Sequence, residues 1–184
     1  GAGEAPGVFA PSVQCEWKVQ AGDPHPTSGL VLATPMVADL PNDSGPSAEI
    51  VFASFAAGDG DGSVSTPGVI RIISGQTCEL KETIEASAGI IRAASPLALA
   101  DLNNDGKIDI VGRKDKGGLI AFGWDGSKFA KLWESTGTIV NQPWDGPSIH
   151  DLNDDGVPEV LLWGEVVNGM TGASASVSFV SCMS

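Results

Sequence analysis

The sequence predicts an all-β fold built from a repeated four-stranded unit, and three observations support this prediction. The 184 residues include 24 glycines and 12 prolines and lack a helical apolar period, a composition typical of short strands joined by tight turns. A nine-residue acidic loop occurs twice, at residues 101–109 and 151–159, each time between two apolar β-type runs. A related phrase lies upstream, so the first aspartates of the three copies, Asp39, Asp101 and Asp151, are 62 and 50 residues apart.

Each repeat divides into four short strands. The predicted strands lie at residues 35–38, 50–55, 68–73 and 79–84, then 96–100, 108–111, 119–123 and 129–133, and finally 147–150, 160–163, 165–168 and 176–180. A repeat of about 50 residues that contains four strands is typical of a β-propeller blade. The sequence therefore predicts about three four-stranded antiparallel blades, within a larger propeller or an oligomer.

The repeats divide the chain into four segments. Residues 1–33 form an N-terminal segment, in which residues 13–19 alternate as the outer strand of a preceding or closing blade would. Blades are predicted at residues 34–89, 90–144 and 145–184, the last with room for an incomplete blade. Propellers close with about four to eight blades, and three blades leave two apolar faces to be covered. We therefore expect self-association or the remaining blades of a longer chain, and the oligomeric state stays open.

The chemistry of the acidic loops predicts calcium. Both loops have the form D-x-N-x-D-G-x-x-(D/E), with oxygen-bearing side chains at positions 1, 3 and 5, glycine at 6 and a carboxylate at 9. Such a set of oxygens suits a hard cation that takes six to eight ligands. An EF-hand is disfavoured, because it needs a glutamate at position 12, where these loops have Gly112 and Leu162.

The small-Pro-apolar strand, the acidic loop and the apolar strand that follows it together resemble the FG-GAP or VCBS-type repeat. This repeat forms the blade of integrin α-subunit propellers and of many bacterial secreted proteins. Residues 95–112 and 146–163 match it well and residues 34–55 match in framework. The resemblance implies that the ion stiffens a turn at the inner strand of each blade and performs no chemistry.

The resemblance also implies two ligand sets. The predicted ligands are the side chains of Asp101, Asn103, Asp105 and Asp109 with the carbonyl of Lys107, and the side chains of Asp151, Asn153, Asp155 and Glu159 with the carbonyl of Val157. The first repeat departs from the pattern, with Pro41 in place of the asparagine and its acid, Glu49, at position 11. Whether residues 39–49 bind a metal through Asp39, Asp43 and Glu49 stays open.

Charge and hydropathy exclude several partners. Ten basic and 23 acidic residues leave a net charge of −13, which argues against nucleic acid and anionic membrane surfaces. There is no apolar run of 18 residues, so no membrane insertion is expected. Open calcium loops of this kind are reliably occupied outside the cell, which favours a secreted or cell-surface protein.

The cysteines and tryptophans allow several arrangements. Cys15, Cys78 and Cys182 permit three alternative single disulfides, and the sequence does not choose among them. Trp17 and Trp133 lie at outer-strand positions and are expected to pack between sheets. Trp124, Trp144 and Trp163 complete a set that could form a sugar-stacking surface, and the first two lie beside turn signals that favour exposure.

We expect a non-catalytic, calcium-stabilised extracellular module that works in adhesion or in recognition of a glycan or a protein. The local sequence offers no converging nucleophile, acid and base, so no catalytic residue and no organic cofactor are predicted, and the chain is not expected to be an enzyme. Two alternatives stay open. One is a structural subunit of a surface or filamentous assembly, and the other is a non-catalytic part of a secreted hydrolase or polysaccharide lyase.

Overall fold

The structure is a computed structural model that describes residues 11–42, 45, 47–56, 67–84, 91–115, 117–137 and 145–175. Every regular element in these ranges is a β-strand. The described ranges hold no helix of the length and apolarity needed to cross a membrane. The all-β prediction is confirmed. The expected strand at residues 176–180, Trp144 and Cys182 lie outside the described residues.

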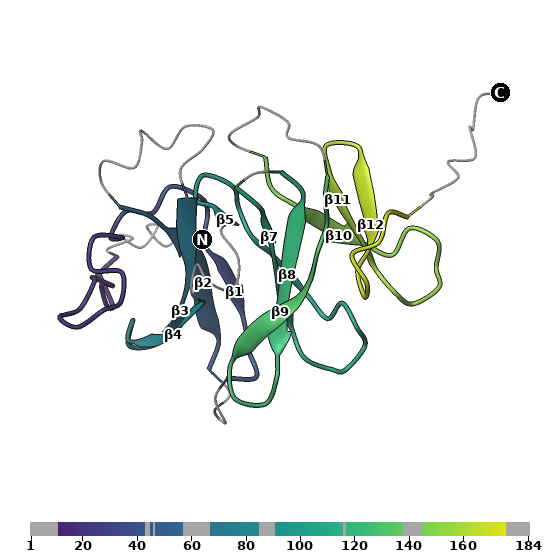
Figure 1. The fold of residues 1–184 in the computed structure, drawn as a ribbon. Coiled ribbons are helices and arrows are strands. Elements are labelled where there is room, and N and C mark those ends of the chain that lie inside the picture. The colour runs from purple at the N-terminus through teal and green to yellow at the C-terminus, as the bar shows by residue number, and fades with distance from the viewer. Residues whose placement is uncertain are drawn as a thin grey trace, which may run out of the picture.

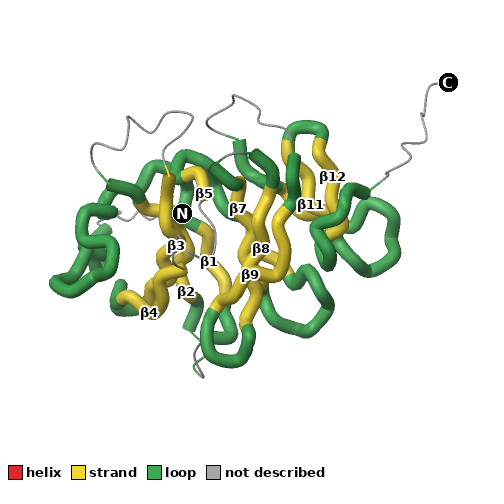
Figure 2. Tube along the Cα trace, in the orientation of Figure 1, coloured by secondary structure: helices red, strands yellow, loops and turns green. Residues whose placement is uncertain are grey.

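The strands form three antiparallel sheets that stand side by side (Figures 1 and 2). The first sheet has the order β1 (Met36–Ala38), β2 (Glu49–Ser54), β3 (Pro67–Ser74) and β4 (Leu80–Ile84), with the short β5 (Ile91–Arg92) also paired to β3. The second has the order β6 (Ala98–Ala100), β7 (Asp109–Arg113), β8 (Leu119–Trp124) and β9 (Phe129–Glu134). The third has the order β10 (Ser148–His150), β11 (Glu159–Leu162) and β12 (Glu165–Asn168).

This arrangement matches consecutive blades of a propeller. Apart from β5, chain order equals spatial order in each sheet. The first strand of the second sheet, β6, contacts the first strands of the other two sheets, β1 and β10. The described sheets form an open row and do not close into a ring (Figure 2). The domain limits proposed from the sequence stay a prediction.

Two apolar cores hold the sheets together. Because side chains alternate between the two faces of a strand, each central sheet face contributes every second residue to a core. The core between the first and second sheets consists of Leu40, Val51, Ala53, Ile70, Ile72, Ile84, Ile91, Leu97, Ile110, Ile120, Phe122 and Phe129. The core between the second and third sheets consists of Leu102, Val111, Leu119, Ala121, Trp133, Val160, Leu162 and Val167.

The strand predicted at residues 13–19 is not formed. Residues 11–20 have no regular secondary structure, so the prediction of an outer blade strand is wrong in this structure. The apolar alternation has another origin, because the half-buried Trp17 packs edge-on against Phe52 of β2 with 4.9 Å between ring centroids. The segment contacts the sheet through side chains and not through a backbone ladder.

Residues 11–30, which we call the N-terminal cap, cover the face of the first sheet that points away from the second. A disulfide joins Cys15 to Cys78, with 5.8 Å between their Cα atoms. Leu30 and Phe55 exchange backbone hydrogen bonds of 3.1 and 3.0 Å at the other end of the cap. The structure therefore selects one of the three disulfides that the sequence allowed.

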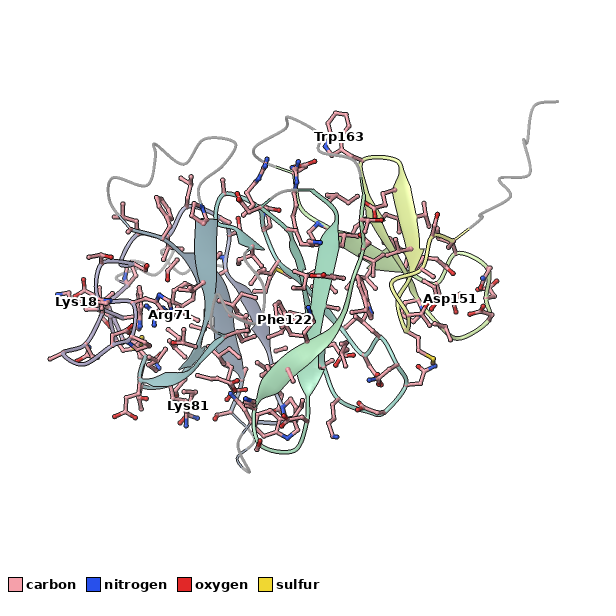
Figure 3. The ribbon with its side chains drawn as sticks, viewed as in Figure 1. Lys18, Arg71, Lys81, Phe122, Asp151 and Trp163 are labelled. Atoms are coloured by element: carbon pink, nitrogen blue, oxygen red, sulfur yellow. A yellow bond between two sulfur atoms is a disulfide. The ribbon has the colours of Figure 1, made fainter. Side chains whose placement is uncertain are left out.

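A buried ion pair joins the cap to the sheet between these two attachments (Figure 3). Arg71 of β3 donates from Nη1 to both carboxylate oxygens of Asp23, at 2.9 and 2.8 Å, and the two side chains are 0% and 1% exposed. Its Nε donates to Ser54 Oγ at 3.1 Å, and its guanidinium lies 5.7 Å from the centre of the Trp17 ring. The ion pair has the hydrogen bonds that a buried charge needs.

Candidate functional site

The two acidic loops share one backbone conformation. Asn104 and Asp154, at position 4, have φ angles of 60° and 58°, and Gly106 and Gly156, at position 6, have φ angles of 79° and 83°. All four angles lie in the left-handed region that glycine, asparagine and aspartate adopt most readily. A Cβ atom would meet nothing within 4 Å at either glycine, so the backbone angle alone demands glycine there.

In the first loop, carboxylates bind backbone amides. The amide of Gly106 donates to Asp101 Oδ2 at 2.8 Å, and the amide of Lys107 donates to Asp105 Oδ1 at 2.9 Å. These bonds turn the chain tightly around the carboxylates at positions 1 and 5.

The second loop repeats these bonds. The amide of Gly156 donates to Asp151 Oδ2 at 2.9 Å, and the amide of Val157 donates to Asp155 Oδ1 at 2.8 Å. Equal spacing in the sequence has therefore produced equal local structure, as expected for two copies of one repeat.

The closing carboxylate of the first loop is buried. Asp109 is 1% exposed, and its Oδ2 accepts a 3.0 Å hydrogen bond from the amide of Leu102. Its Oδ1 has no hydrogen-bond partner in the described residues. Burial raises the pKa of Asp109 to about 6, the Leu102 amide opposes this rise, and the negative charges of Asp105 and Asp101 add to it.

The closing carboxylate of the second loop has more partners. Glu159 is 2% exposed, and its Oε2 accepts a 2.8 Å hydrogen bond from the amide of Leu152. The side-chain amide of Asn153 donates to Glu159 Oε1 at 3.3 Å and to Asp155 Oδ2 at 3.1 Å. This amide bridges two carboxylates, so the second loop is better compensated than the first.

The first repeat keeps the closing bond. The amide of Leu40 donates to Glu49 Oε2 at 2.8 Å, and Glu49 is fully buried while Asp39 is exposed. Asp43 lies outside the described residues. Metal binding by residues 39–49 therefore stays an open question.

The two complete loops are also in direct contact. Asn104 Nδ2 of the first loop donates a 2.8 Å hydrogen bond to the backbone carbonyl of Gly156 in the second. This hydrogen bond links the two loops directly.

The donor chemistry fits a hard cation, although the side chains are not gathered into a metal cluster. Across the described ranges, no group of three or more histidine, cysteine, aspartate or glutamate side chains is placed to hold a metal ion. Each predicted ligand set contains oxygen donors alone, which is the preference of calcium. The partnerless, buried Oδ1 of Asp109 is the observation that a cation would explain.

The tryptophans divide into packed and exposed residues. Trp133 is 7% exposed and its Nε1 donates to the Gly169 carbonyl at 2.6 Å, so it packs between sheets as expected. Trp124 is half-buried against Phe129 with 5.6 Å between ring centroids, which makes the expectation of exposure wrong for this residue. Trp163 is 56% exposed.

A cavity of about 350 Å³ lies between the second and third sheets. It is found at the ends of β7, β9 and β11, whereas the acidic loops precede β7 and β11. The cavity and the acidic loops therefore lie at opposite ends of the sheets. Polar groups of Arg113, Ser135, Asp145 and Glu165 line it together with Trp163.

The sequence predicted that Trp163 ends a strand and could belong to a sugar-stacking set, but it did not predict a turn at this residue. In the structure, β11 ends at Leu162 and Trp163 begins the turn to β12. The signal that could have found it is the pair Trp-Gly between two β-type runs, because a two-residue spacer that ends in glycine marks a hairpin turn.

Comparison with known proteins supports the repeat. Residues 83–162 match the family model described as FG-GAP-like repeat, which confirms the resemblance over this stretch. This repeat is of the propeller type, in agreement with the four-stranded second sheet. No curated protein sequence matches the chain significantly.

One solved structure is similar over most of the chain. It is the crystal structure of the V. cholerae biofilm matrix protein Bap1, with a TM-score of 0.47 and 22% sequence identity. The similarity covers 89% of this chain and 33% of that one. This chain thus spans about a third of the length of that protein.

Proposed function

We propose that this chain, whose residues 83–162 match the FG-GAP-like repeat, is a calcium-stabilised, extracellular propeller module with a non-catalytic role in recognition or adhesion. The observation that carries the calcium assignment is the carboxylate of Asp109, which is 1% exposed and has one oxygen without a hydrogen-bond partner in the described residues.

A buried carboxylate needs compensation. An ionised group that leaves water without a full set of partners destabilises the fold, so it protonates or binds a cation. Asp109 has a pKa of about 6, raised first by burial, and remains ionised in part at neutral pH. Calcium would offset most of the negative charge of Asp101, Asp105 and Asp109, with Asn103 and the Lys107 carbonyl as neutral ligands.

The second loop would hold a second ion through Asp151, Asn153, Asp155, Glu159 and the Val157 carbonyl. Here the side-chain amide of Asn153 donates to two of the carboxylates, at 3.1 and 3.3 Å. The Asn153 amide group holds the carboxylates of Asp155 and Glu159 together, and a bound cation would replace it in this role. Its oxygen would serve as the ligand, because calcium binds oxygen and not an amide nitrogen.

The proposed role in recognition follows from rigidity. The ions would stiffen the turns that join β6 to β7 and β10 to β11, and the hydrogen bond from Asn104 to Gly156 would couple the two turns. A scaffold of this kind presents loops for binding a protein or a glycan. The disulfide between Cys15 and Cys78 supports an oxidising, extracellular compartment, where such bonds persist.

Thermal unfolding in calcium and in EGTA tests the metal. Ligand at one hundred times its dissociation constant stabilises a protein by about 2.7 kcal/mol, so the melting temperature should rise by several degrees in calcium. Asp109→Asn should reduce this rise, and in EGTA it should melt above the wild type because a buried charge has been removed. Glu134→Gln, which removes an exposed carboxylate from the second sheet, is the matched control and should keep the full rise.

An equal melting temperature in calcium and EGTA for the wild type would contradict the proposal. So would an Asp109→Asn variant that responds to calcium as strongly as the wild type does.

A structural role in an assembly is the second candidate, and the outer face of the third sheet favours it. Val160 and Val167 face the second sheet, so their neighbours Leu161 and Val166, which are cross-strand partners, face away from it and are partly exposed. An exposed apolar pair on the last sheet of a stack suits packing against another sheet. Sedimentation of the protein over a concentration series would separate this candidate from a monomeric module.

A further inference from the structure

The turn that joins β11 to β12 places a tryptophan in a backbone conformation that tryptophan rarely adopts. Trp163 and Gly164 form a two-residue hairpin between the paired residues Leu162 and Glu165. Their φ angles are 47° and 79°, as a turn of type I′ requires. Asparagine and glycine are the residues that favour such a turn, whereas a bulky aromatic residue at positive φ is an outlier. The turn therefore gains nothing from the tryptophan.

The core gains nothing from it either. Trp163 is 56% exposed and projects from the tip of the hairpin (Figure 3). One side of it lines the cavity between the second and third sheets. A strained, exposed tryptophan at the mouth of a cavity points to contact with a ligand, because backbone strain persists where function uses the side chain.

Asp145 supplies a hydrogen-bond acceptor at this cavity. Its Oδ1 pairs with Arg113 of β7, whose side chain is 2% exposed. Its Oδ2 is buried and has no hydrogen-bond partner in the described residues. A buried acceptor without a donor requires an explanation, and a ligand hydroxyl supplies one once the Asp145 side chain, which is 16% exposed, turns Oδ2 toward the cavity.

Glu165 supplies a second acceptor in a fixed position. Its Oε1 accepts a 2.6 Å hydrogen bond from Ser135 Oγ, which itself accepts a 2.8 Å hydrogen bond from the amide of Leu119. A Cβ atom at Gly137 would overlap the Glu165 carboxylate, so the glycine provides the room for it. The carboxylate is thus held by groups of the second sheet while it lines the cavity.

The charges of the cavity lining disfavour an anionic ligand. Arg113 and Asp145 neutralise each other, so Glu165 leaves the lining negative, and the whole chain carries −13. Repulsion from both sources disfavours uronic acids, sulfates and phosphates. The volume of about 350 Å³ is at the small end of ligand sites.

We propose that this cavity binds one uncharged sugar residue of a glycan, which stacks on Trp163 and donates hydroxyl hydrogens to Asp145 and Glu165. An aromatic face and paired acceptors complement the apolar face and the hydroxyl edge of a sugar ring. This inference rests on the proposed role in recognition and gives it a ligand class and a position, at the end of the sheets opposite the acidic loops.

Saturation-transfer NMR and tryptophan fluorescence titration with simple glycosides test the site. The probes are the methyl glycosides of glucose, galactose, mannose and N-acetylglucosamine, with glucuronate and glucosamine as charged counterparts. A ligand of this size binds with a dissociation constant of about 1 mM, so millimolar concentrations are needed. At least one neutral glycoside should bind, and glucuronate should bind at least about tenfold more weakly.

The informative variant is Trp163→Asn, which installs the residue that the turn prefers. Its melting temperature should equal or exceed that of the wild type, while its affinity for the neutral glycoside should fall at least about tenfold. Trp163→Tyr keeps an aromatic face, so its affinity for the neutral glycoside should stay within a few-fold of the wild-type value. This variant tests the site even if the asparagine variant folds poorly. Met170→Gln removes another exposed apolar side chain, in the turn after β12 and outside the cavity, and should bind as the wild type does.

Three results would overturn the inference. They are no binding of any neutral glycoside, tighter binding of glucuronate than of every neutral glycoside, and undiminished binding by Trp163→Asn. The calcium-dependent melting shift is measured on the same samples. Its persistence in the absence of sugar binding refutes this site alone, and its loss refutes the proposed calcium-stabilised module.

Discussion

The two ends of the three-sheet stack are held by different contacts. At the first sheet, the N-terminal cap is attached by a disulfide, a buried ion pair and a backbone bridge. At the third sheet, the described residues are held to the second sheet by packing around Trp133, which donates to the Gly169 carbonyl and lies against Gly172. The cap is held by covalent and polar contacts, whereas the third sheet is held to the second by packing and by hydrogen bonds such as that from Ser135 to Glu165.

This difference shows where the stack can accept a partner. The outward face of the first sheet carries Phe52 and Arg71, and both are covered by the cap. The outward face of the third sheet carries Leu161 and Val166, which remain partly exposed in the described residues. A further blade or a second protein would therefore find the first sheet covered by the cap and the third sheet with exposed apolar surface.

The buried ion pair is the largest single contribution to test. Arg71→Met leaves the Asp23 carboxylate, which is 1% exposed, without its guanidinium, and should lower the free energy of unfolding by about 3–5 kcal/mol. The double variant Arg71→Met with Asp23→Leu removes both charges and should be less destabilised than the single variant. Urea denaturation measures both, and an equal loss in the two would show that packing, not charge, attaches the cap.

Removal of the disulfide should have the next largest effect. Cys15 and Cys78 are 63 residues apart, and a crosslink of this span contributes about 2–4 kcal/mol by restricting the unfolded chain. The variant Cys15→Ser with Cys78→Ser should lose that much in urea denaturation, and dithiothreitol should have the same effect on the wild type. An unchanged urea midpoint of the wild type in dithiothreitol would mean that the noncovalent contacts alone hold the cap on the first sheet.

The opposite end should be sensitive to one added methyl group. A Cβ atom at Gly172 would lie 2.5 Å from Cε3 of Trp133, and the residue has a φ of 68°. Gly172→Ala should therefore cost about 1–3 kcal/mol through overpacking and backbone strain. Gly126→Ala is the matched control, because its φ of 104° is also positive but a Cβ atom there has open space. An equal loss of stability in both variants would show that the loss comes from backbone strain alone and that the Trp133 contact leaves room for a methyl group.

The smallest effect is expected where the capped sheet meets the second sheet. Glu82 of β4 accepts a 2.8 Å hydrogen bond from the amide of Phe129, and burial raises the pKa of Glu82 above its usual value of 4.5. A carboxyl whose pKa is higher in the folded state binds its proton more tightly there, so stability falls as pH rises from 4.5 through the folded pKa.

Glu82→Gln keeps the acceptor and removes the charge. It should stabilise the protein by less than about 1 kcal/mol at pH 7, and the gain should disappear below pH 4.5, where the wild-type carboxyl is protonated in both states. Thermal melts over this pH range measure the difference. A gain that does not change with pH would place its cause outside the titration of Glu82.

Local pattern predicted much of the fold, and its failures occur at contacts between distant segments. The strand at residues 165–168 was placed correctly, and the identical loop conformations at Gly106 and Gly156 followed from a shared spacing. The strand at residues 13–19 failed, because alternation reports burial on one side and does not say whether a sheet edge or a side-chain contact provides it. Trp163 was assigned to a strand and not to a turn, because positive φ is a property of the backbone conformation and not of the residue type.

The sequence by itself determined the repeat, the strand order within each sheet and the oxygen donors of the acidic loops, since these depend on residues close together in the chain. Only the tertiary structure decided that Cys15 joins Cys78, that the cap covers Arg71, and that Trp163 stands over a cavity between two sheets. The physical reason is that pairing and cover depend on which distant surfaces meet. That meeting is chosen by the total burial of the chain and not by any local preference.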